Sequence, residues 1–319
     1  MVGRIEYIDR MRGLAMMLVV AGHVLFYNGY ASSPLCYAIY AFHMPLFFII
    51  SGYVNHYVWK PIDVWSYFKK SGMRLIVPYV LWSIIFVVAQ SIQMSDLTLN
   101  TACSMFPVWA YWFIPCLFIM HWMHYAVYAC KGKVWQQIGI ILCLLVIVVG
   151  MYVWLRYELL KRVIAYIIPY AFGVLLAEKP EVLQTIIKKR WLAIINAMVG
   201  MATMVVYYYA PNAQLIAQVA RLVCGLSMSC MLLYAYYNLE DRGYLKRWGG
   251  IESYVGKCTM GTYFIHQIIV RAWMLPDGMG LGMQMITTIG SMAAITTICV
   301  GFIWIIQKIP VVNKLLLGK

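Results

Sequence analysis

Long apolar stretches separated by short polar segments recur along the whole chain. Most hold about 18–25 residues with few charges, which is the length a helix needs to cross a ~30 Å hydrocarbon core. Inside lipid a helix satisfies its own backbone hydrogen bonds. The pattern predicts an all-α, polytopic membrane helical bundle of about ten transmembrane helices, with spans at residues 11–30, 35–57, 74–94, 107–130, 135–155, 163–178, 191–210, 214–237, 258–275 and 283–307. No polar segment is long enough for a separate soluble domain, so we expect a single integral membrane domain over residues 1–319.

The basic residues are unevenly distributed between the predicted loops. With the N-terminus inside, most of the 25 lysines and arginines fall on the cytoplasmic side, whereas the outer loops hold only Arg156, Lys161 and Arg162. Such a bias sets the orientation of membrane proteins. It predicts an N-in, C-in topology and accounts for the net charge of +14 without nucleic acid as a partner. Most of the nine cysteines lie in apolar stretches, where they are expected as small buried side chains.

His23 lies about halfway through the first apolar stretch, eleven residues after Arg12. At ~100° and ~1.5 Å per residue, the two side chains share one helix face and His23 lies about 16 Å deeper in the membrane. An ionisable residue at that depth is a candidate functional residue, and a neutral imidazole can act as a general base. All eleven acidic residues fall in loops or near span ends. The alternative is a structural histidine that is hydrogen-bonded to a neighbouring helix.

Two later segments add histidines to the predicted membrane interior. The stretch from Phe42 to Tyr53 contains His43, a proline that favours a kink, and Ser51. In the stretch Thr259–Gln267, Tyr263 and His266 are three residues apart and share a helix face. Each of these side chains suits either substrate contact or helix packing. His121 and His124 are three residues apart, a spacing at which two histidines of a helix can bind one metal ion. No third ligand is evident, so we expect no metal site.

Cationic side chains suggest two binding regions. Lys69, Lys70 and Arg74 precede the third span at the inner face, where they form either an ordinary positive flank or a clamp for phosphates. Arg221 and Arg271 lie in the outer halves of spans eight and nine. They either line a pocket for an anionic acceptor or extend their charges to the outer interface.

Four places in the chain resemble the acyltransferase-3 family of integral membrane O-acyltransferases, in its fucose-4-O-acetylase-like branch. The resemblance is carried by the segment from Ile8 through Arg12-Gly13 to His23, by Phe42 to Tyr53, by Trp112-Phe113-Ile114 and by the Tyr263–His266 pair. Many members carry Arg-x-x-Arg before the third span. Here Arg74 matches the second arginine, Ser71 occupies the first position, and Lys70 is the candidate substitute.

The resemblance implies transfer of an acyl group, usually acetyl, from cytoplasmic acyl-CoA to a hydroxyl of a glycan or glycolipid. In the mechanism that we infer, His23 is the general base, Tyr263, His266 and Ser51 assist at the reacting carbonyl, Arg221 and Arg271 bind the acceptor, and the donor is held by Arg12, Lys70, Arg74, His43 and Trp112. An acyl-histidine intermediate is a second route. Acetyl-CoA is a co-substrate, no permanently bound cofactor is expected, and the protein is placed among the lipids of a bacterial inner membrane. The competing hypotheses are a multispan transporter or flippase for a lipid-linked or anionic substrate, and a membrane sensor or scaffold.

Overall fold

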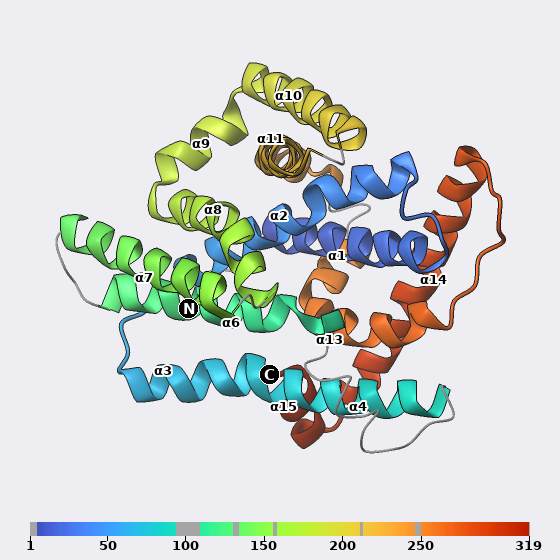
Figure 1. Ribbon diagram of the computed structural model, residues 1–319, viewed down its shortest axis with the longest axis horizontal. Coiled ribbons are helices and arrows are strands. Elements are labelled where there is room, and N and C mark those ends of the chain that lie inside the picture. The colour runs from blue at the N-terminus through green and yellow to red at the C-terminus, as the bar shows by residue number, and fades with distance from the viewer. Residues whose placement is uncertain are drawn as a thin grey trace. The chain divides into compact units, whose positions relative to one another are not determined.

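The computed structural model describes residues 5–93, 109–129, 134–155, 158–210, 213–245 and 250–318. Every regular element in these ranges is a helix (Figure 1), which confirms the all-α prediction. Within them, seven helices are long and apolar enough to cross a membrane: α1 (Glu6–Tyr27), α2 (Pro34–Tyr57), the continuous helix Val64–Gln93, α8 (Glu158–Glu178), α10 (Arg190–Tyr209), α11 (Gln214–Asp241) and α14 (Leu281–Gln307). They overlap seven of the ten predicted spans.

The other three predicted spans coincide with helices outside this set. These are α6 (Phe113–Ala129), which is apolar but shorter, α7 (Val134–Leu155) and α13 (Gly250–Arg271). The number of spans and the N-in, C-in topology therefore stay predictions.

Helix α8 runs from Glu158 to Glu178, so Lys161 and Arg162, which were counted with an outer loop, are helical. The Glu158 carboxylate lies 3.9 Å from the Lys161 ammonium.

Contacts between Cα atoms divide the chain into two compact units. Unit 1 comprises residues 1–57 and 169–303, and unit 2 comprises residues 58–168 and 304–319. Unit 1 holds α1, α2, α10, α11, α13, α9 (Pro180–Lys188) and the larger part of α14. Within it α1 packs along α13 and α2, and α10 packs against α11 (Figure 1).

Glycines bring α1 and α13 into close contact. A Cβ atom on Gly13 would lie 2.0 Å from the carbonyl oxygen of Glu252, and one on Gly256 would lie 1.9 Å from that of Asp9. Only glycine permits this approach, as at other close helix crossings. His23 follows Gly13 by ten residues, and His266 follows Gly256 by ten residues. Because the two offsets are equal, the crossing places both histidines at the same level.

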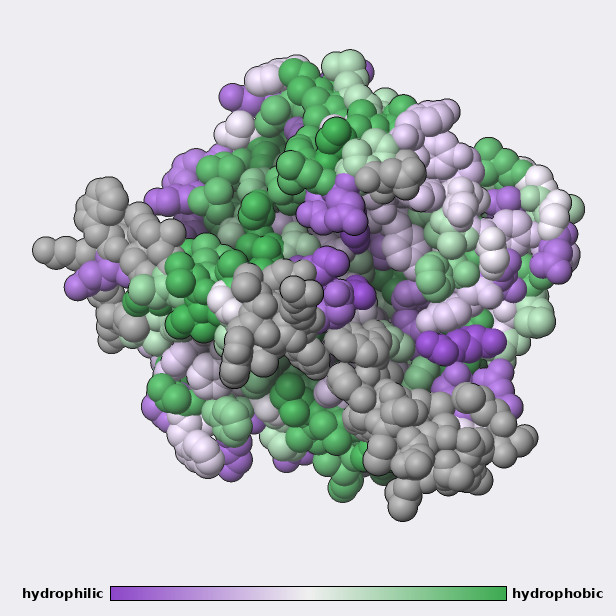
Figure 2. Space-filling view, in the orientation of Figure 1, coloured by the Kyte–Doolittle hydropathy of each residue, from purple (hydrophilic) through white to green (hydrophobic). Residues whose placement is uncertain are grey.

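The outer face of α10 is apolar. Ile194, Met198, Met201 and Val205, spaced by three or four residues, are each about half exposed. Figure 2 shows hydrophobic side chains gathered over this helix, at the top of the view. A stripe of this kind is unfavourable in water, and it fits a helix that faces lipid.

In unit 2, α3 (Val64–Ser71), a π-helical turn η1 (Gly72–Ile76) and α4 (Val77–Gln93) follow one another in a single helix. Asp63 caps its start by accepting a hydrogen bond from the Ser66 amide at 2.9 Å, and the hydrogen bonds from Ser66 lower the pKa of that carboxyl. The short helix α15 (Pro310–Leu317) packs on α4, where the Trp82 indole donates to the Leu316 carbonyl at 2.9 Å. Unit 2 also holds α6, α7 and the turn η2 (Trp109–Tyr111).

Candidate active site

Two histidines from α1 and α13 form the centre of the site in unit 1. His23 Nδ1 lies 2.9 Å from His266 Nε2, and the two rings are stacked at 5.2 Å between centroids. His266 is fully buried, and its Nδ1 donates to the Thr262 carbonyl at 2.8 Å. Neutral His266 therefore carries its one proton on Nδ1, and its Nε2 accepts a hydrogen bond. His23 Nδ1 supplies that proton, which leaves His23 Nε2 with a lone pair that can take a proton from a substrate.

A row of polar side chains connects His23 to the end of α13. Gln267 Nε2 lies 3.0 Å from His23 Nδ1, and the Tyr27 hydroxyl donates to Gln267 Oε1 at 3.5 Å. Arg271 donates to that hydroxyl at 3.1 Å, and its guanidinium lies 4.8 Å from the centre of the Tyr27 ring. Arg271 is thus linked to His23 through two side chains.

His43 and Tyr263 surround this histidine pair. His43 is buried and donates from Nδ1 to the Ile39 carbonyl at 2.7 Å. The Tyr40 ring lies between His43 and His23, with centroid distances of 4.9 Å and 6.4 Å. The buried Tyr263 ring is 6.0 Å from that of His266. The structure therefore brings together His23, His43, Tyr263 and His266, which the sequence singled out on three separate helices.

Ser51, Arg12 and Arg221 are placed differently. Ser51 is half-buried, eight residues beyond His43, which is about 12 Å along α2. Arg12 is on the same continuous helix as His23, as predicted, and its guanidinium lies 3.8 Å from Asp9. Arg221 is half-buried within α11. Their catalytic and binding roles stay predictions.

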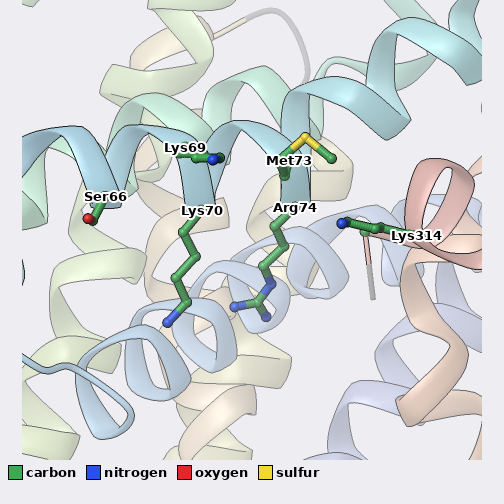
Figure 3. Close-up of a pocket in the computed structure, with 7 residues that line it drawn as sticks. Ser66, Lys69, Lys70, Met73, Arg74 and Lys314 are labelled. Atoms are coloured by element: carbon green, nitrogen blue, oxygen red, sulfur yellow. The ribbon is translucent and has the colours of Figure 1, made fainter.

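A cationic hollow of about 440 Å³ lies on unit 2, between α3 and α15. Its lining includes Lys69, Lys70, Arg74 and Lys314, and none of its described lining residues is acidic. In Figure 3 the Lys70 and Arg74 side chains point the same way, and Lys314 reaches toward them from α15. Lys70 and Arg74 are four residues apart on one continuous helix. This spacing places their side chains on one side of the helix.

Trp112 belongs to a second cationic cluster in unit 2. The Arg162 guanidinium lies over its indole ring at 4.4 Å, and the Tyr166 ring is stacked against it at 5.6 Å. An arginine stacked on an indole keeps its outer N–H groups available for an anion. Arg162 was not among the predicted site residues, because it was placed in a loop.

Sequence reasoning also missed Tyr27, Gln267 and Lys314. Tyr27 stands one helical turn after His23, and Gln267 is adjacent to His266. The spacing alone could have identified these two. Lys314 gave no such signal, because only the folding of α15 onto α4 brings it to the hollow.

Comparison with known proteins gives a family. A family model described as "Acyltransferase domain" matches residues 5–308, which is nearly the whole chain. The nodulation protein NolL of Mesorhizobium japonicum is 29% identical over 123 residues, covering 35% of this chain and 32% of that protein. The chain therefore spans about a third of this curated relative's length. No solved structure matches.

Proposed function

The chain belongs to the acyltransferase domain family and is an integral membrane acyltransferase, and on that premise we propose that it moves an acetyl or other short acyl group from cytoplasmic acyl-CoA to a hydroxyl of a glycan or glycolipid. The observation that carries the proposal is the hydrogen-bonded pair of His23 and His266. The pair supplies a base inside the membrane, where an acceptor hydroxyl needs one.

His23 Nε2 removes the proton of the acceptor hydroxyl while the hydroxyl oxygen attacks the thioester carbonyl. The carbon–sulfur bond then breaks, and the leaving CoA sulfur takes the proton from His23, so the products are an ester and free CoA. During the step His23 carries a positive charge, which its Nδ1–H shares with His266 Nε2 at 2.9 Å. A positioned base of this kind contributes ~10²–10⁴-fold. We assign Tyr263 and Ser51 to the reacting carbonyl.

We assign the phosphates of the donor to the hollow on unit 2. Arginine binds phosphate oxygens in pairs, and lysines add point charges. The cationic lining of Lys69, Lys70, Arg74 and Lys314 supports this assignment. Ser71 occupies the position of the first arginine of Arg-x-x-Arg, and the alignment of Lys70 with Arg74 supports Lys70 as the substitute for that arginine. Arg12, His43 and Trp112 are assigned to the donor as well, with His43 at the acyl end because one ring separates it from His23.

The acceptor is assigned to the outer end of α13 and to α11. Arg271 connects to His23 through Tyr27 and Gln267, so an acidic sugar or a lipid-linked phosphate on Arg271 would hold its hydroxyl near the base. Arg221 is the second cation assigned to it. We place the protein in a bacterial inner membrane, among its lipids.

The proposal is tested by incubating membranes that contain the protein with radiolabelled acetyl-CoA. The expected result is label in the glycan or glycolipid fraction that depends on the protein. Movement of an acceptor across the membrane without transfer of label would instead identify a carrier or flippase.

A further inference from the structure

Arg162 in unit 2 has a positive charge that no other described residue pairs with. It belongs to α8, a helix that is long and apolar enough to cross a membrane. Its Nε is buried, and no hydrogen bond or ion pair joins its guanidinium to another residue of the described ranges. Glu158, four residues earlier, lies 3.9 Å from Lys161 instead. An unpaired arginine is costly in a membrane helix and marks a candidate ligand site.

Two aromatic rings hold this guanidinium in place. The guanidinium lies over the Trp112 indole at 4.4 Å, and the buried Tyr166 ring, one turn further along α8, is stacked on the same indole at 5.6 Å. Stacking uses the flat face of the guanidinium. The N–H groups at its edge stay available, and they match the paired oxygens of a phosphate or a carboxylate.

We propose that Arg162, held on the Trp112 ring, binds the phosphate or carboxylate group of a substrate. The inference rests on the proposed function and adds a second anion site to it. Both substrates of that function can supply the group, because CoA carries several phosphates and the acceptor is an acidic sugar or a lipid-linked phosphate. The chemistry at Arg162 is the same in either case.

This site is separate from the cationic hollow of unit 2. Tyr111, the neighbour of Trp112, contacts the Phe86 ring of α4 at 5.4 Å between centroids. Phe86 follows Arg74 of the hollow by twelve residues on one continuous helix, which is ~18 Å along its axis. A single phosphate therefore cannot contact both Arg74 and Arg162, and the group at Arg162 is a different one.

The test measures the KM for radiolabelled acetyl-CoA and the KM for the membrane glycan fraction separately, in membranes that contain equal amounts of protein. Arg162→Ala removes the guanidinium, and Arg162→Lys keeps the charge without the paired N–H groups. Lys161→Ala is the matched control, because Lys161 is the adjacent cation of α8 and its exposed side chain lies beside Glu158.

We expect Arg162→Ala to raise one of the two KM values about 10- to 100-fold with little change in kcat, as when charge-assisted hydrogen bonds are lost. A higher KM for acetyl-CoA assigns the site to a phosphate of the donor, and a higher KM for the glycan fraction assigns it to the acceptor. Arg162→Lys should raise the same KM by a smaller factor. Lys161→Ala should keep both wild-type values.

Wild-type KM values for both substrates in Arg162→Ala would overturn the inference and leave the proposed function standing, whether or not kcat falls. If Arg162→Ala does not fold, Arg162→Lys decides, and two unchanged KM values in that variant overturn the inference. Wild-type membranes that transfer no label would instead overturn the proposed function and with it this site.

Discussion

Replacing Gly256 with alanine is expected to separate the two helices that carry the histidine pair. A Cβ atom at this position would lie 1.9 Å from the Asp9 carbonyl oxygen, where ordinary contact begins at 3.4 Å. The obstacle is backbone, so the helices must move apart by about 1.5 Å. Carried along the parallel helices to the histidines, this shift lengthens their 2.9 Å contact to about 4.4 Å, beyond the range of a hydrogen bond.

A misplacement of 1 Å at a reacting group can cost ~10²-fold. We therefore expect Gly256→Ala to lower kcat for acetyl transfer about 100-fold, measured from initial rates with radiolabelled acetyl-CoA in membranes that contain equal amounts of protein. Gly290→Ala in α14 is the matched control, because nothing lies within 4 Å of a Cβ atom there, and it should keep the wild-type rate. A Gly256→Ala variant with the wild-type kcat would refute the argument that this crossing sets the distance between the histidines.

Two further predictions concern the donor and the topology. Arg74→Ala should raise the KM for acetyl-CoA at least ~10-fold with little change for the acceptor, because it removes the only arginine among the described residues that line the hollow. Lys308→Ala, whose ammonium lies over the Trp304 ring, is the control, and an unchanged donor KM would refute the clamp. Single cysteines at positions 60 and 188, in a variant without other reactive cysteines, should react with an impermeant thiol reagent only from the cytoplasmic side. Reaction from outside would contradict the N-in topology.

The sequence was sufficient for the helices, and it pointed to the histidines that the structure brings together. The apolar lengths identified helices at each predicted span, since a helix in lipid must be long and apolar. The isolated histidines in those stretches were informative because an ionisable group is costly there. The absence of acidic residues from the spans pointed to the same side chains.

The contacts between helices could not be predicted in the same way. The spacing of Arg12 and His23 drew attention to one helix, whereas the partner of His23 is on another helix, 243 residues away. His23 and His266 each follow a glycine of the helix crossing, Gly13 and Gly256, by ten residues. These equal offsets indicate the pairing of the two histidines only once the two helices are known to be parallel neighbours.

The burial of Arg10 is a second feature that position alone could not predict. Its side chain is 3% exposed, and its guanidinium contacts Glu6 at 2.6 Å and the Leu245 carbonyl at 3.0 Å. A charged side chain near a helix start is usually solvated, and only the fold of the later chain around it buries the charge.

The most direct test of the account is the rate of acetyl transfer by His23→Ala. His56→Ala is the matched control, because His56 is a half-buried histidine at the end of α2 and has no assigned role. The account predicts that His23→Ala inserts normally and loses at least ~100-fold in kcat, while His56→Ala keeps the wild-type rate. Transfer by His23→Ala at a rate near that of the wild type would contradict the central claim that this histidine is the base.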